Sequence, residues 1–282
     1  MNAVEVRGLR KSYGDFEAVR GIDFELPAGE VFGLLGPNGA GKTTTVEILV
    51  GYRRRDAGEV RVLGADPEHA DRTWRGRIGI VPQSGELFPT LTVLETLELF
   101  AGYYDSPRLP AEVLAHVGLE EKARAKTRTL SGGQQRRLDL GVALVGDPEL
   151  LFLDEPTTGF DPSARRAAWE TIRSLRSLGK TILLTTHYIE EAHQLADRVA
   201  VLTRGQIVAS GTPAELIGQA PSTVIRYRRN GELVVLETED PVRVLHELTE
   251  EALRDGTDLR DLEVHRPTLE EVYLSLTEER AE

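Results

Sequence analysis

A glycine-rich stretch, GPNGAGKT, occupies residues 36–43 and matches the pattern G-x-x-x-x-G-K-[ST]. Glycines let backbone N–H groups wrap around a phosphate, a lysine at this position reaches the β- and γ-phosphates, and the next hydroxyl can hold Mg2+. An apolar run before the loop and a helical pattern after it provide the setting that this chemistry needs. A glycine-rich turn without a ligand is the alternative. The predicted phosphate site comprises Gly36, Pro37, Asn38, Gly39, Ala40, Gly41, Lys42, Thr43 and Thr44.

Two acidic residues end another apolar run, LLFLDEP. In α/β folds ligands bind at the carboxyl ends of buried strands, so Asp154 and Glu155 are well placed for chemistry. Asp154 could steady Mg2+ through water, and Glu155 could polarise a water for attack on a γ-phosphate. Taken alone, the pair is better interpreted as two solvated carboxylates that open a loop. Beside a phosphate loop, the catalytic interpretation is favoured.

Gln83 and His187 also follow apolar strand patterns, in RIGIVPQ and TILLTTH. Taken alone, Gln83 is simply a loop glutamine, and a lone histidine is more often structural than catalytic. Position is what favours His187, because a strand's carboxyl end places it at the same edge of the sheet as Asp154. The other candidates of its type are His69, His116, His193, His246 and His265.

The segment LSGGQQRR begins at Leu130 and combines a helix start with two glycines. Ser131 and Gln134 fit a capping box, which explains the helix start. It does not explain Gly132 and Gly133, because glycine costs roughly 1 kcal/mol against alanine inside a helix. A helix N-terminus with bare N–H groups and a serine hydroxyl can bind an anion, and small residues permit close approach. We therefore expect a ligand to approach this turn.

The remaining patterns predict an α/β chain. Three short strands are expected between Val4 and Leu35, and helices dominate between Ser84 and Asp147. Buried strands then alternate with helices as far as about Leu216. A linker is expected near Gly218–Ser222, followed by two strands and two helices in a small appendage.

Composition narrows the class of protein. The 282 residues are 40% hydrophobic, which is enough for a sizeable core. A formal charge of -12 disfavours nucleic acid as a partner. The absence of cysteine excludes disulfides, thiolate metal sites and thiol catalysis, and suits a reducing cytoplasm. No stretch approaches the roughly eighteen apolar residues of a membrane span, so a role at a membrane needs a partner subunit.

Taken together, these motifs resemble one family, the nucleotide-binding subunits of ATP-binding cassette (ABC) transporters. GPNGAGKT resembles its Walker A motif, LLFLDE its Walker B motif and LSGGQ its signature, and PQS, GFDP and TTH resemble its Q-, D- and H-loops. All six occur in family order within about Val4–Leu216. The resemblance implies a P-loop NTPase core in residues 1–217, with an N-terminal antiparallel β-subdomain and an inserted helical subdomain at about 84–146. Residues 222–282 would form a small α+β accessory domain.

The resemblance also implies roles for individual residues toward ATP and Mg2+. Tyr13 would stack on adenine, Glu155 would be the catalytic base, and Gln83 and His187 would contact the γ-phosphate. Thr43, Gln83 and Asp154 would serve Mg2+. Asp161 would communicate across a subunit interface, and Phe160 departs from the leucine usual beside it. In the family, Ser131 and Gly133 bind the γ-phosphate held by the opposite subunit, so the nucleotide contacts of that turn would come from Ser131, Gly132, Gly133 and Gln134.

FPTLTVLETLELFAGYY and HRPTLEEVYLSLTEE resemble the ATPase subunits of type-two exporters. This implies an ATPase at the cytoplasmic face of the cell membrane, attached through a polytopic permease and paired with a second ATP-binding subunit as a homodimer. The alternatives are a soluble ABC ATPase of translation or DNA maintenance, and an importer ATPase.

Overall fold

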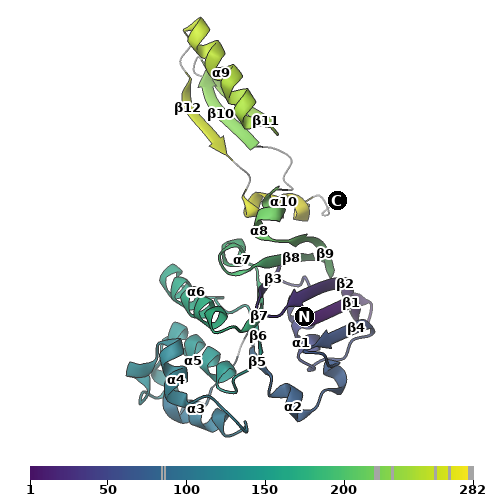
Figure 1. Ribbon diagram of the computed structural model, residues 1–282, viewed down its shortest axis with the longest axis vertical. Helices are drawn as coiled ribbons and strands as arrows, with labels where there is room; N and C mark the ends of the chain where they lie inside the picture. Colours follow the sequence, from purple (N-terminus) through teal and green to yellow (C-terminus); the bar gives the residue numbers. More distant parts are fainter. Residues whose placement is uncertain are drawn as a thin grey trace. The chain divides into compact units, whose positions relative to one another are not determined.

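We describe a computed structural model of the chain, which covers residues 1–282 except 84, 86, 219–222, 230–231, 257–258, 266–267 and 279–282 (Figure 1). The chain divides into two compact units, Met1–Ser210 and Gly211–Glu282, and each is described by itself. The domain limits expected from the sequence, 1–217 and 222–282, stay a prediction. Most of the expected linker, at 219–222, lies outside the described residues.

A six-stranded sheet forms the centre of the first unit, in the order β5-β6-β7-β3-β8-β9. Neighbouring strands from β5 through β8 run parallel. Three of them, β3, β6 and β7, are buried along their whole length, which explains their continuous apolar sequences. Because parallel strands end at one edge, the segments after β3, β5, β6 and β7 converge there. The bounds are β3 Val31–Leu35, β5 Ile78–Val81, β6 Leu150–Asp154, β7 Thr181–Thr186, β8 Arg198–Thr203 and β9 Gln206–Gly211.

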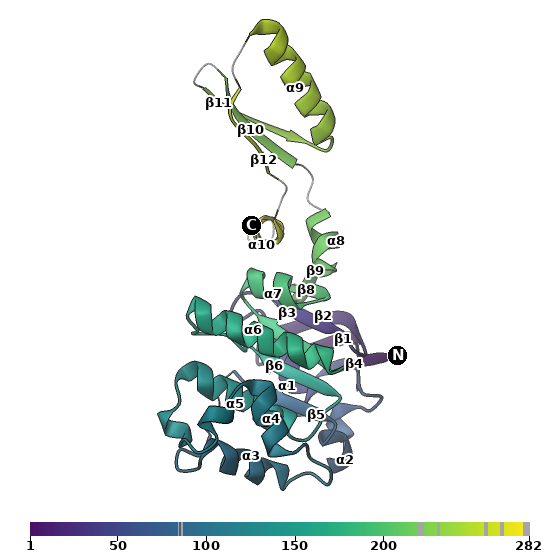
Figure 2. The same ribbon diagram turned by 60° about the vertical axis from the view of Figure 1, so that its left-hand side comes forward.

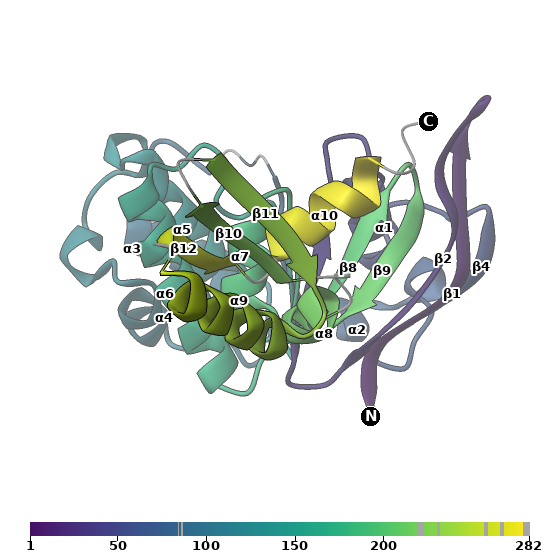
Figure 3. The ribbon, with the colours of Figure 1, turned by 90° about the horizontal axis from the view of Figure 1, so that it is seen from above.

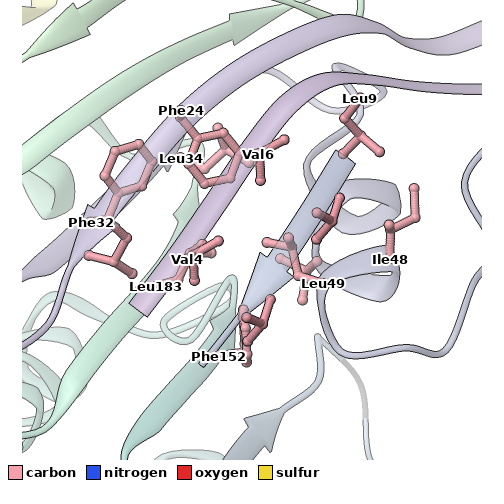
Figure 4. Close-up of a cluster of buried hydrophobic side chains, with 14 of the residues drawn as sticks. Val4, Val6, Leu9, Phe24, Phe32, Leu34, Ile48, Leu49, Phe152 and Leu183 are labelled. Atoms are coloured by element: carbon pink, nitrogen blue, oxygen red, sulfur yellow. The ribbon is translucent and has the colours of Figure 1, made fainter. Parts of the chain in front are cut away.

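An antiparallel sheet in the order β2-β1-β4 makes the expected N-terminal β-subdomain. It lies on the side of the parallel sheet away from the helical subdomain (Figure 3). The two sheets and the helix after the phosphate loop, α1, share one apolar core, in which Phe24 and Phe32 stack with ring centroids 5.1 Å apart (Figure 4). The bounds are β1 Asn2–Tyr13, β2 Phe16–Pro27, β4 Ala57–Val62 and α1 Lys42–Leu49.

The inserted helical subdomain gathers three helices beyond the β5 edge of the parallel sheet (Figure 1). Both α3 and α5 begin with a complete capping box, built on Thr92 and Ser131 respectively. Gly141 of α5 lets the helices approach, since an added Cβ would lie 3.3 Å from Leu97 and from Val113. The bounds are α3 Val93–Ala101, α4 Pro110–Val117 and α5 Gly132–Leu144, with 3-10 turns η2 Glu120–Lys122 and η3 Thr127–Thr129.

The other helices of the first unit connect the strands of the parallel sheet. Asp161 caps α6, which carries Trp169 and Ile172 into the core, and α7 follows the strand that ends before His187. Among the described residues, we find no helix long and apolar enough to span a membrane. The bounds are α6 Pro162–Ser177, α7 Ile189–Leu195, α2 Arg72–Arg75 and η1 Pro67–His69.

The second unit corrects one expectation, because its described residues form three strands rather than two. They form an antiparallel sheet in the order β11-β10-β12, and α9 runs along one face of it (Figure 2). The additional strand, β12, is exposed or half-exposed throughout: Leu262 and Val264 alternate with polar residues in its short sequence RDLEVH, but neither is buried. The bounds are α8 Pro213–Gly218, β10 Thr223–Arg229, β11 Glu232–Thr238, α9 Pro241–Asp255, β12 Arg260–His265 and α10 Leu269–Glu278.

Candidate nucleotide-hydrolysis site

A cavity of about 320 Å³ lies at the edge where the parallel strands end. It brings together many of the residues predicted for the nucleotide site. They come from four separate segments: the β1–β2 hairpin, the phosphate loop, the segment after β5 and the end of β6. Phe16 and Ala18 belong to it as well, and sequence reasoning missed both. The lining residues are Tyr13, Phe16, Ala18, Asn38, Gly39, Gly41, Lys42, Thr43, Thr44, Gln83 and Glu155.

The phosphate loop requires glycine at two of its positions for different reasons. At Gly36, an added Cβ would lie 2.2 Å from the backbone oxygen of Leu202, closer than atoms can approach. Gly41 has a φ of 106°, and its Cβ would lie 2.5 Å from the oxygen of Ala18. The first glycine therefore permits packing against β8, and the second permits the turn that starts α1.

The buried ammonium of Lys42 is held over the loop by three oxygen atoms. It donates to the carbonyls of Gly36 and Pro37 at 2.7 and 3.1 Å and lies 3.1 Å from Glu155 Oε1. An ammonium fixed in this way is a point charge at the mouth of the phosphate loop. A γ-phosphate there would compete with Glu155 for it.

Glu155 is the most highly connected side chain of the site. Its Oε2 accepts hydrogen bonds from Gln83 Nε2 at 3.3 Å and Thr158 Oγ1 at 3.0 Å, and lies 3.2 Å from His187 Nδ1. Burial alone would raise the pKa of Glu155, but the Lys42 ammonium and the Thr158 hydroxyl outweigh it and hold the pKa below its ordinary value. The carboxylate is therefore ionised at neutral pH and can accept a proton.

The backbone of Glu155 turns sharply to place that carboxylate. Its φ is 47°, a left-handed conformation that costs a residue with a side chain about 1 kcal/mol. The turn is held by the Glu155 N–H, which donates to the carbonyl of Thr185 at 3.2 Å and to its hydroxyl at 3.0 Å. Thr185, like Thr158, supports the carboxylate and was missed, because its part depends on β6 and β7 being neighbours.

The side chains expected to hold Mg2+ supply suitable oxygens. Thr43 and Gln83 are exposed and line the cavity, and Asp154 ends β6 with only 4% of its surface exposed. The Thr185 hydroxyl donates to Asp154 Oδ1, which fixes that carboxylate. Hydroxyl, amide and carboxylate oxygens suit Mg2+, which commonly takes one or two protein ligands beside the substrate's phosphates. The donor set therefore fits a Mg2+ ion shared with a nucleotide.

The other end of the cavity offers a flat aromatic surface. Tyr13 and Phe16 face each other as a cross-strand pair at the tip of the β1–β2 hairpin, and both are exposed. The Arg53 guanidinium lies 5.1 Å and the Lys11 ammonium 5.7 Å from the centroid of the Tyr13 ring. Such a surface suits the stacking of a nucleobase.

The LSGGQ turn forms the capping box that its sequence predicts. The Gln134 N–H donates to Ser131 Oγ at 3.3 Å, and the Ser131 N–H donates to Gln134 Oε1 at 3.0 Å. An added Cβ at Gly132 would meet no atom within 4 Å, and one at Gly133 would meet only Ala164 Cβ, at 3.5 Å. The described residues that line the phosphate-loop cavity include none from this turn. The turn is a second feature with room for a ligand, and Gly132 lines a neighbouring cavity that Gln83 and Glu155 also line.

Asp161 has a structural role within its own chain. One of its carboxylate oxygens accepts from the N–H groups of Ser163 and Ala164 at 2.8 and 2.9 Å, and so caps α6. Its role across a subunit interface stays a prediction.

These features define a class of protein: an α/β nucleoside triphosphatase with a phosphate loop, an acidic strand end and a converging glutamine and histidine. The model of the ABC transporter family matches residues 19–158. Nod factor export ATP-binding protein I of Ralstonia nicotianae is 43% identical, covering 97% of this chain and 93% of the relative. The protein of the same name from Burkholderia orbicola is 48% identical over 76% of this chain and 72% of the relative. The chain belongs to the ABC transporter family and is an ATP-binding, ATP-hydrolysing subunit.

Solved structures agree on the fold. The cbiO1 protein of Clostridium perfringens, part of the ABC transporter complex cbiONQ, superimposes with a TM-score of 0.71 at 28% identity, covering 77% of this chain and 91% of that one. A dimeric ATP-binding cassette in a post-hydrolysis state, bound to ADP and phosphate, has a TM-score of 0.66 at 28% identity, covering 74% and 98%. The predicted family and fold class are confirmed.

Proposed function

We propose that this chain energises export as one of two identical subunits that clamp ATP between them. The observation that carries the proposal is the open space around Gly132 and Gly133. Neither position has a positive φ, and neither is crowded by its own chain. Glycine at both positions is therefore explained by an external group approaching the turn, and the phosphate held by the loop of a second copy is such a group.

Within one copy, the residues of the cavity divide the chemistry of hydrolysis. Lys42 neutralises charge on the γ-phosphate, while Thr43, Gln83 and Asp154 would hold Mg2+, which would supply further charge stabilisation. Glu155 accepts the proton of the attacking water, and His187 and Gln83 keep that carboxylate and the phosphate in place. Tyr13 stacks on adenine. A second copy contributes Ser131, Gly132, Gly133 and Gln134, with Asp161 at the contact between the copies.

The relatives support the direction of transport and the kind of partner that we propose. Proteins named for Nod factor export match this chain along almost its whole length, which supports export over import and over a role in translation or DNA maintenance. We infer that the cassette pair attaches to a polytopic permease at the cytoplasmic face of the membrane. Loss of the shared phosphate after hydrolysis would let the pair open and drive the permease.

Replacing either glycine of the LSGGQ turn with alanine tests this proposal. Gly132→Ala and Gly133→Ala should leave the thermal midpoint unchanged or higher, because alanine favours a helix and has room there. ATP affinity of the single chain should stay within about three-fold, while turnover falls by about ten-fold or more, since one lost charge-assisted contact is worth about 1.5–3 kcal/mol.

Gly218→Ala is the matched control, because this glycine of α8 also has open space and no positive φ. It should not change turnover. Full turnover by Gly132→Ala and Gly133→Ala would contradict the clamp, because the turn would then have no second phosphate to meet.

A further inference from the structure

Arg136 is a side chain of α5 that leaves the helical subdomain and enters the parallel-sheet core. Only 9% of its surface is exposed. It lies one helical turn after Gly132, so its Cα is only about 6 Å along the axis from the LSGGQ turn. The residue therefore connects that turn to whatever its guanidinium touches.

The guanidinium touches the two segments that carry Gln83 and Glu155. Nη1 donates to the carbonyl of Pro82 at 2.6 Å, immediately before Gln83. Nη2 donates to the carbonyl of Asp154 at 2.9 Å and more weakly to that of Glu155 at 3.4 Å, and Nε donates to the carbonyl of Pro156 at 3.1 Å.

Arginine suits this position because its planar fork presents several N–H donors in fixed directions. The carbonyls of Pro82, Asp154 and Pro156 accept from it, and Asp139 Oδ2, 3.6 Å from Nη1, balances its charge. A buried cation with so many fixed partners resists movement of any one of them relative to the others. The left-handed turn at Glu155 lies among these carbonyls.

We propose that Arg136 is a positioning residue for ATP hydrolysis, which holds Gln83 and Glu155 in register with the LSGGQ turn of the same chain. Its hydrogen bonds go to backbone carbonyls of the segments that carry Gln83 and Glu155, so it acts through the backbone of its partners. Where two copies clamp ATP, as proposed above, the turn contacts one nucleotide while Gln83 and Glu155 serve the other. Arg136 then couples the two sites. This coupling rests on the proposed function, whereas positioning within one chain does not.

The neighbouring Arg137 provides a matched control. It also lies on α5 and also donates to backbone carbonyls, those of Gly118 at 2.9 Å and Val117 at 3.4 Å. Both acceptors belong to the end of α4 within the helical subdomain. Arg137→Gln therefore removes a similar set of hydrogen bonds without touching the segments of Gln83 or Glu155.

The experiment compares Arg136→Gln, Arg136→Lys and Arg137→Gln in the full chain, measuring kcat, KM for ATP, ATP affinity and Tm. Arg136→Gln should lower kcat by about 30-fold with KM and affinity within about three-fold, because small displacements of catalytic groups are costly. Arg136→Lys should recover part of kcat, since an ammonium can satisfy some of the carbonyls. Arg137→Gln should keep kcat within about two-fold of the parent value, even where it lowers Tm as much as Arg136→Gln does.

A double-variant cycle with Gln83→Ala separates positioning from general destabilisation. If Arg136 acts through the Gln83 segment, the two losses in kcat will be less than additive. Additive losses, or a kcat that follows Tm across Arg136 and Arg137 variants alike, would overturn the proposal. If Gly133→Ala keeps full turnover while Arg136→Gln still lowers kcat selectively, positioning stands and only the coupling falls.

Discussion

At the scale of single residues, the site is organised around the Glu155 carboxylate. One of its oxygens contacts Lys42, and the other accepts from Gln83 and Thr158 and lies beside His187. The same side chain would therefore compete with a bound phosphate for the lysine, and its ionised carboxylate can accept a proton. Phosphate binding should draw Lys42 away from Glu155 and leave the carboxylate facing the water that attacks.

Glu155→Gln tests this arrangement. The amide keeps the shape but cannot take a proton, so phosphate release should fall by about 100-fold or more. ATP affinity should be unchanged or higher, because Lys42 no longer has a carboxylate partner. Equilibrium binding of a fluorescent ATP analogue and single-turnover phosphate release check both, and size-exclusion chromatography with ATP should show a trapped dimer.

Glu190→Gln is the control for Glu155→Gln, since this exposed glutamate lies only three residues after His187. It should behave as the unsubstituted protein does. Phosphate release by Glu155→Gln above about a tenth of the normal rate would exclude Glu155 as the base.

Sequence reasoning located the residues that follow strands but not those that support them. Gly36, Gln83, Glu155 and His187 could be predicted to converge, because each follows an apolar strand and parallel strands end together. Thr158 and Arg136 could not, because their importance comes from contacts between segments distant in sequence. The sequence holds a weak indication that Phe16 belongs to the site, because Phe16 directly follows the hairpin turn, opposite Tyr13.

At the scale of elements, α5 has a buried middle and begins at the turn where we propose that ATP binds. Its capping box and the packing glycine Gly141 were predictable from local pattern, whereas the hydrogen bonds of Arg136 with the core were not. The third strand of the second unit was missed for a similar reason, since β12 is short, buries neither Leu262 nor Val264, and owes its place to pairing with β10. Local pattern therefore predicts elements that bury one face and fails where pairing alone defines them.

The buried face of α5 also makes stability depend on pH. Burial raises the pKa of Asp139 to about 6, despite the nearby Arg136. A carboxyl whose folded-state pKa exceeds its unfolded value destabilises the fold once it ionises, so its contribution falls as pH rises from about 4 to 7. The raised pKa corresponds to about 2–3 kcal/mol.

Asp139→Asn removes this dependence. The free energy of unfolding of the variant, relative to the parent, should rise by about 2 kcal/mol between pH 4 and pH 7. Urea unfolding at several pH values measures it, and Glu98→Gln, an exposed change on α3, controls for loss of one negative charge. A relative stability that stays flat, or falls with pH, would show that Asp139 is not the responsible group.

At the scale of the whole molecule, the proposed clamp gives a single chain two halves of an ATP site. The phosphate loop with Glu155 is one half, and the LSGGQ turn is the other. Ser131→Arg should therefore abolish turnover while leaving ATP affinity within about three-fold, because it damages only the half offered to a partner. Lys42→Ala should abolish turnover by weakening the phosphate site of its own chain.

Mixing these two inactive variants makes the decisive measurement. In a mixed pair, one site combines the intact phosphate loop of the Ser131→Arg chain with the intact turn of the Lys42→Ala chain. Random pairing of equal amounts should therefore recover up to about a quarter of normal turnover, because half the pairs are mixed and each has one good site. A variant carrying both substitutions, mixed with either single variant, restores no complete site and should recover nothing. If each chain instead hydrolyses ATP alone, mixing will add nothing to the activities of the separate variants, since pairing then creates no new site.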